Sequence, residues 1–119
     1  MTRINPINSI LIVTDNVTRR KIYQLFFGAR GVYVELVGDG AEAINKFESG
    51  AFDLILNDLQ SQDCHGNRIA EHIHDSGTVT PMITMTSAKD FTHPHHATVL
   101  QKPFSMETLV SKIQTVAAA

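Results

Sequence analysis

The chain has 119 residues, a length that predicts one domain with a two-layer or three-layer core. Hydrophobic residues make up 43% of the sequence and the formal net charge is −2, so the composition argues against disorder and gives no electrostatic case for binding nucleic acid or an anionic membrane. A single cysteine, Cys64, permits no internal disulfide, and no apolar run approaches the ~20 residues that span a bilayer. Because no apolar signal segment follows Arg3, we expect a cytoplasmic location.

The predicted elements alternate between strands and helices along the chain. Residues 1–8 are polar, contain Pro6 and are predicted to form a tail or linker, and the domain is expected over residues 9–119. Apolar and β-branched runs predict strands at 10–13, 32–37, 52–58, 81–85 and 98–100. Helices are predicted at 17–30 and 41–48, from Gly66 to near Ser76, and after Ser105. This alternation predicts an α/β fold with a doubly wound, five-stranded parallel sheet in the flavodoxin-like order 2-1-3-4-5.

The first predicted helix has apolar residues at roughly helical spacing and three consecutive basic residues on the other side. We expect the apolar positions to face the sheet and the basic ones to face solvent. The apolar positions are Val17, Ile22, Leu25, Phe26 and Ala29, and the basic ones are Arg19, Arg20 and Lys21.

The segment between the fourth and fifth strands, residues 89–97, breaks the alternation. It contains Pro94 and three histidines and shows no helical apolar stripe, so we expect a shortened or missing fourth helix. His93, His95 and His96 lack the regular spacing of a metal site, which favours a solvated loop over a metal-binding or pH-sensing role.

Four polar side chains follow the ends of four predicted strands. Asp15 comes after the first strand, Asp58 ends the third, Thr86 follows the fourth and Lys102 follows the fifth. In open parallel sheets, chemistry collects beyond the carboxyl ends of the strands. Two nearby carboxylates repel each other unless a cation lies between them, and Mg²⁺ with oxygen ligands meets that need. Together with a hydroxyl and an ammonium group, this set suits the acceptance of a phosphoryl group.

Over essentially residues 8–117, the chain resembles the receiver domain of two-component response regulators and hybrid histidine kinases, the CheY-like fold. The segments that carry the resemblance are Ile10–Asn16, Asp39–Ile44, Phe52–Asp58, Gly66, Pro81–Ser87 and Lys102–Phe104. The resemblance implies that Asp58 is the phosphoacceptor and that the Thr86 hydroxyl senses the phosphoryl group. It also implies that Lys102 is the ion-pair partner of the phosphorylated site. It also implies that Asp15, Asp58 and the backbone carbonyl of Gln60 bind Mg²⁺, and that the Lys102–Pro103 bond is cis.

The sequence departs from the family pattern at several positions. Thr14 stands where a second acidic residue is usual, so we expect it to be a weakened metal ligand at most. Gln62 replaces a proline in the loop after the acceptor, and Val99 replaces the aromatic switch residue. The stretch from Thr86 to Lys102 is also shorter than in the family, which removes part of the usual output face.

Two functions remain open from the sequence, and a third is disfavoured. The first is a phosphoacceptor in a phosphorelay, taking a phosphoryl group from a phosphohistidine onto Asp58, with no enzyme activity beyond self-phosphorylation and autodephosphorylation. Its partners would be a histidine kinase, a histidine phosphotransfer protein or other domains of the same polypeptide. The alternative is a pseudo-receiver that binds proteins independently of phosphate. A flavodoxin-like redox protein is disfavoured because the loop at Thr14–Thr18 has no glycine to hold a phosphate.

Overall fold

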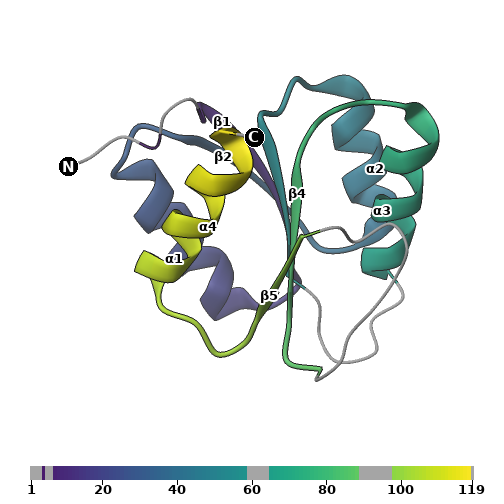
Figure 1. Ribbon diagram of the computed structural model, residues 1–119. Coiled ribbons are helices and arrows are strands. Elements are labelled where there is room, and N and C mark those ends of the chain that lie inside the picture. The colour runs from purple at the N-terminus through teal and green to yellow at the C-terminus, as the bar shows by residue number, and fades with distance from the viewer. Residues whose placement is uncertain (1–3, 5–6, 59–64, 89–97, 119) are drawn as a thin grey trace.

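The computed structural model describes residue 4 and residues 7–58, 65–88 and 98–118. Its five strands form one parallel sheet in the order β2-β1-β3-β4-β5, which confirms the predicted topology. The strands are β1 (Ser9–Val13), β2 (Tyr33–Val37), β3 (Leu54–Asp58), β4 (Met82–Thr86) and β5 (Thr98–Gln101). The helices of the described part are α1 (Val17–Gly28), α2 (Gly40–Ser49), α3 (His65–Ser76) and α4 (Met106–Ala118). Helices α1 and α4 cover one face of the sheet, and α2 and α3 cover the other (Figure 1).

The middle strand, β3, is buried along its whole length. Leu54 and Leu56 pack into the hydrophobic cluster under α1 and α4, whereas Ile55 packs into the cluster under α2 and α3. Successive side chains of a strand point to opposite faces, so a strand covered on both faces needs a continuous apolar run. The run ends at Asp58, and this carboxylate therefore lies at the carboxyl edge of the sheet, below the protein surface.

The N-terminal segment contributes to the core. The sequence predicts a tail or linker for residues 1–8, but Ile4 and Ile7 are buried in the cluster under α1 and α4. The Ile7 backbone N–H donates a 2.7 Å hydrogen bond to the Ile4 carbonyl, and both side chains pack into the same cluster. At these two positions the segment packs as part of the domain.

Helix α1 is rotated relative to the prediction. Its buried residues are Tyr23 and Phe27, whereas Val17 and Leu25 are 72% and 73% exposed. The predicted inward face is therefore wrong at Val17, Ile22, Leu25 and Ala29, which are all exposed. Tyr23 and Phe27 are four residues apart on one helical face, and their rings bury more apolar area than valine or leucine. Because Arg19 lies four residues before Tyr23, the same rotation turns this arginine toward the sheet instead of solvent.

The helices differ from the expected set in one further respect. The prediction of a shortened or missing fourth helix falls on residues 89–97, which lie outside the described residues. The two residues described after β4, Ser87 and Ala88, are not helical. Within the described part of the chain, no helix combines the length and the apolar character that crossing a bilayer requires.

Candidate phosphoacceptor site

The centre of the site is the carboxylate of Asp58, whose side chain is fully buried. A carboxylate removed from water needs cations or hydrogen-bond donors around it. The guanidinium Nη1 of Arg19 lies 3.1 Å from Oδ1 and 3.3 Å from Oδ2, and the ammonium of Lys102 forms an ion pair with Oδ1. The hydroxyl of Tyr23 donates a 3.3 Å hydrogen bond to Oδ2. Both oxygens of Asp58 therefore accept from protein donors.

Helix α1 brings two of these donors to Asp58. The chain turns directly after β1, and Asn16 caps the helix by accepting a 2.9 Å hydrogen bond from the Arg19 backbone N–H. This cap starts the helix beside the end of β3, since β1 and β3 are hydrogen-bonded neighbours. Arg19 and Tyr23 are four residues apart and share one face of the helix, so both side chains reach the same carboxylate.

Lys102 reaches Asp58 from the opposite side of the site. It follows β5 directly, and its backbone N–H donates a 2.7 Å hydrogen bond to the Thr86 carbonyl at the end of β4. The Lys102–Pro103 peptide bond is cis, as the resemblance predicted. The Lys102 side chain is 10% exposed, so its charge lies close to Asp58 with little solvent around it.

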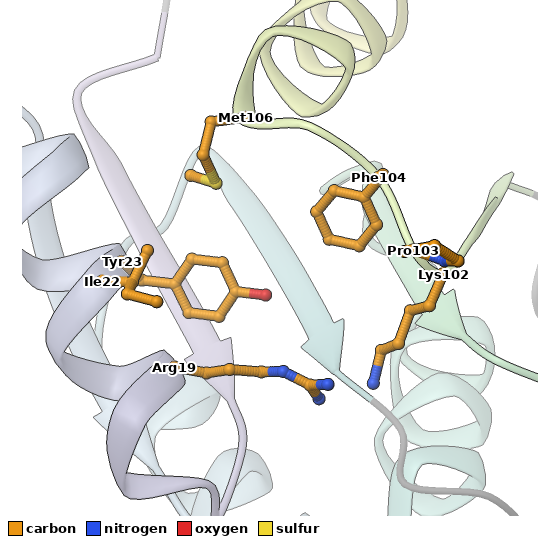
Figure 2. A pocket seen from close by; sticks show the side chains of 7 residues that line it. All are labelled: Arg19, Ile22, Tyr23, Lys102, Pro103, Phe104 and Met106. Atoms are coloured by element: carbon orange, nitrogen blue, oxygen red, sulfur yellow. The ribbon is translucent and has the colours of Figure 1, made fainter.

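A pocket of about 250 Å³ opens beside these groups. Figure 2 shows the Arg19 guanidinium and the Lys102 ammonium pointing toward each other across it, with the phenol of Tyr23 between α1 and Phe104. Its lining residues are Arg19, Ile22, Tyr23, Lys102, Pro103, Phe104 and Met106. The pocket thus offers two cationic heads within an otherwise mainly apolar wall, a combination that suits an anionic group carried on a partner's surface.

The surroundings of Tyr23 keep its hydroxyl in the protonated, neutral form. Burial raises the pKa of its hydroxyl well above the ordinary value of 10.0, and the nearby negative charge of Asp58 raises it further. Arg19 acts in the opposite direction, but its effect is smaller than that of burial. The Tyr23 hydroxyl therefore remains a hydrogen-bond donor to Asp58 throughout the neutral pH range.

Thr86 lies at the same edge of the sheet but makes a different contact. It ends β4, is 1% exposed, and follows Met85, the residue paired with Asp58 in the β3–β4 ladder. Its hydroxyl oxygen accepts a 3.1 Å hydrogen bond from the Ala88 backbone N–H. A hydroxyl that accepts one hydrogen bond keeps its own proton to donate. The Thr86 hydroxyl, at the same edge of the sheet as Asp58, can therefore still donate a hydrogen bond to a group that becomes attached to Asp58.

Of the predicted Mg²⁺ ligands, Asp58 is engaged with Arg19 and Lys102, and Thr14 and Asp15 directly follow β1. Asp15 is exposed, and the Thr14 hydroxyl accepts a 3.2 Å hydrogen bond from the Asn16 backbone N–H. Gln60 lies outside the described residues. Within the described ranges, no group of three acidic, histidine or cysteine side chains is placed to hold a metal. Since both Asp58 oxygens face Arg19, the described residues do not fit a divalent cation while that contact is made.

The alternative of a histidine metal site gains no support from the described histidines. His72 of α3 pairs with Glu48 of α2 on the surface. The three histidines of the predicted loop, His93, His95 and His96, lie outside the described residues.

Arg19 and Tyr23 are the residues in contact with Asp58 that sequence reasoning missed. Residues Arg19, Tyr23 and Phe27 recur every four positions and form one stripe that begins directly behind the Asn16 cap. A stripe that starts at the end of β1 points toward the edge where Asp58 lies. This spacing was the available signal, and it was obscured because Val17, Ile22 and Leu25 suggested a different buried face.

Comparison with known proteins agrees with this geometry. The model of the response regulator receiver domain family matches residues 10–114. An uncharacterized transcriptional regulatory protein of Bacillus subtilis, YclJ, is 33% identical over 114 residues, which cover 90% of this chain and 49% of that protein. The chain thus spans about half the length of this curated relative.

Solved structures show the same fold. The response regulator TrrA of Thermotoga maritima, solved in complex with Mg²⁺-BeF, has a TM-score of 0.79 at 23% identity, covering 92% of this chain and 98% of that one. The Saccharomyces cerevisiae Ssk1 receiver domain, solved with the histidine phosphotransfer protein Ypd1, has a TM-score of 0.77 at 24% identity, covering 95% and 90%. This chain belongs to the response regulator receiver domain family and is a receiver domain of two-component signalling.

Proposed function

We propose that Asp58 accepts a phosphoryl group from a phosphohistidine of a partner protein. The observation that carries the proposal is the placement of the Asp58 carboxylate at the end of β3, where it pairs with Arg19 and Lys102, two residues that also line the neighbouring pocket. An Asp58 oxygen would attack phosphorus and form an acyl phosphate. The P–N bond would break at the same time, and its electron pair would remain on the histidine nitrogen.

Lys102 and Thr86 have separate tasks in this transfer. The ammonium of Lys102 would move from the carboxylate to the incoming phosphoryl oxygens and neutralise their charge. The Thr86 hydroxyl would donate a hydrogen bond to a phosphoryl oxygen once the group is in place. No step of the transfer is assigned to a metal, because Mg²⁺ at Asp15 and Asp58, as predicted from the sequence, would require Arg19 to leave the carboxylate.

The partner is proposed to be a histidine kinase or a histidine phosphotransfer protein, or such a domain elsewhere in the same polypeptide. The relevant surface is the exposed apolar side of α1 beside the pocket, formed by Val17, Ile22 and Leu25. The Ssk1 receiver, which shares this fold, was solved with the phosphotransfer protein Ypd1. Without a partner, the activity would be limited to self-phosphorylation from small donors and slow autodephosphorylation.

The test is the intact mass of the protein after incubation with a small phosphodonor such as phosphoramidate. We expect a single phosphoryl adduct on the wild type and none on Asp58→Asn. The matched control is Asp75→Asn, which makes the same chemical change at an exposed position of α3 and should leave the adduct intact.

Two results would contradict the proposal. An adduct on Asp58→Asn would move the acceptor to another residue. A wild type that stays folded by circular dichroism but takes no adduct would favour the pseudo-receiver, and the search would turn to partners that bind without phosphate.

A further inference from the structure

The contact between Arg19 and Asp58 occupies the side of the carboxylate that faces the pocket. A single nitrogen, Nη1, lies within 3.3 Å of both oxygens, and the Arg19 side chain is 36% exposed while that of Asp58 is fully buried. Tyr23, four residues further along α1, donates to Oδ2 and anchors the same helical face. Arg19 therefore contacts the acceptor and lines the pocket at the same time.

The charges around Asp58 are already balanced by protein groups. Arg19 and Lys102 supply two positive charges, and Asp58 and Asp15 supply two negative charges at this edge of the sheet. Thr14 adds no charge, and its hydroxyl oxygen is used by the Asn16 backbone N–H. A divalent cation would leave two uncompensated positive charges here, in a region where like charges repel strongly. The site thus has two carboxylates and two protein cations, so its charge is balanced before any metal binds.

We propose that Arg19 takes the place of a divalent cation at Asp58, so that phosphorylation of this receiver does not require Mg²⁺. The inference rests on the proposed function of Asp58 as the acceptor. A guanidinium has five N–H donors in a planar fork, and only Nη1 is engaged with Asp58 in the contacts described above. Because Arg19 also lines the pocket, its remaining donors would bind phosphoryl oxygens there as charge develops during transfer.

The first test measures the rate of adduct formation from phosphoramidate by intact mass, in excess chelator and in excess Mg²⁺. We expect the wild-type rates in the two conditions to agree within about 2-fold, since the internal cation is present in both. Arg19→Ala should lose about 100-fold in chelator and recover part of that loss with Mg²⁺. Arg19→Lys should be intermediate, because a point charge cannot span the carboxylate and the phosphoryl group as a planar fork does.

The matched control is Lys21→Ala, which removes one positive charge from an exposed position of the same helix. It should behave as the wild type in both conditions. Circular dichroism and thermal unfolding establish that each variant is folded before its rate is compared. A wild type that forms the adduct only with Mg²⁺ would overturn the inference and leave the proposed function of Asp58 intact.

A second readout does not depend on phosphorylation. Binding of Mn²⁺, followed by electron paramagnetic resonance, should be at least about 10-fold tighter for Arg19→Ala than for the wild type, since a vacated carboxylate is a better oxygen ligand. Equal affinities would overturn the inference. If no variant forms an adduct under any condition, the proposed function fails, and the Mn²⁺ comparison still decides whether Arg19 excludes the metal.

Discussion

Asp58 has two flanks, each of which supplies one cation and one hydroxyl. The α1 flank supplies Arg19 and Tyr23, and both contact the carboxylate directly. The β4–β5 flank supplies Lys102, which contacts the carboxylate, and Thr86, whose hydroxyl oxygen accepts from the Ala88 backbone N–H. The two flanks have the same chemical groups, but both groups of the α1 flank contact the acceptor, whereas on the β4–β5 flank the contact described is that of Lys102.

The difference suggests a division of labour. Residues on α1 lie on one helical face and are held by the packing of Tyr23 and Phe27, so their contacts stabilise the carboxylate before any phosphoryl group arrives. Thr86 lies at a strand end, where its hydroxyl needs only a rotation about one side-chain bond to reach a new acceptor. The α1 flank would therefore set the acceptor's charge balance, Lys102 would act during the transfer, and Thr86 would respond to the product.

The largest effect is expected for the cation of the β4–β5 flank. Lys102→Met keeps the length of the side chain but removes its charge, so phosphoryl oxygens would lose a fixed cation and adduct formation should slow by about 100-fold. The rate is measured by intact mass with phosphoramidate. Lys112→Met on α4 makes the same change away from the site and should leave the rate unchanged. An unchanged rate for Lys102→Met would show that Arg19 alone supplies the charge.

A smaller effect is expected for the hydroxyl of the α1 flank. Tyr23→Phe removes a buried hydrogen bond to Asp58 and should lower the free energy of unfolding by about 1 kcal/mol near neutral pH. Because the pKa of Tyr23 is raised in the folded protein, its protonated form stabilises the fold below the unfolded pKa of about 10, and this contribution is lost as the pH rises further.

The difference between wild type and Tyr23→Phe should therefore shrink by about 1 kcal/mol between about pH 8 and about pH 10.5. Urea unfolding of both proteins at the two pH values measures this difference in unfolding free energy. Tyr33 is present in both proteins, so its own raised pKa, caused by a hydrogen bond to Glu35, cancels in the comparison. If the difference in unfolding free energy between wild type and Tyr23→Phe stays constant with pH, the pKa of the Tyr23 phenol is not raised in the folded protein.

The smallest effect on phosphorylation is expected for the hydroxyl of the β4–β5 flank. Thr86→Val preserves the side-chain volume and removes the acceptor of the Ala88 N–H, which should cost about 1 kcal/mol or less in unfolding free energy. The rate of adduct formation from phosphoramidate should change by less than about 3-fold, since the hydroxyl acts after transfer. A loss as large as that of Lys102→Met would place the Thr86 hydroxyl in the transfer step itself and remove the contrast between the two flanks.

The sheet and one part of the site could be predicted without a structure. Apolar runs and strand–helix alternation predicted the order 2-1-3-4-5, and strand ends in a parallel sheet share one edge, which predicted that Asp58 and Lys102 meet. The burial of Ile4 and Ile7 was missed because two isolated isoleucines in a polar segment show no periodicity. Asp15, predicted beside the metal, is exposed, and Thr14 is engaged with its own turn.

The sequence alone was sufficient for features that depend on local patterns: which runs form strands, where each strand ends, and hence which polar residues share the carboxyl edge. The rotation of α1 depended on the tertiary fold, because several apolar residues compete for the buried face and the outcome follows the packing of Tyr23 and Phe27 against the sheet. That rotation places Arg19 on Asp58. The charge balance of the acceptor is thus a consequence of how one helix packs, and competing apolar spacings along the chain leave that packing open.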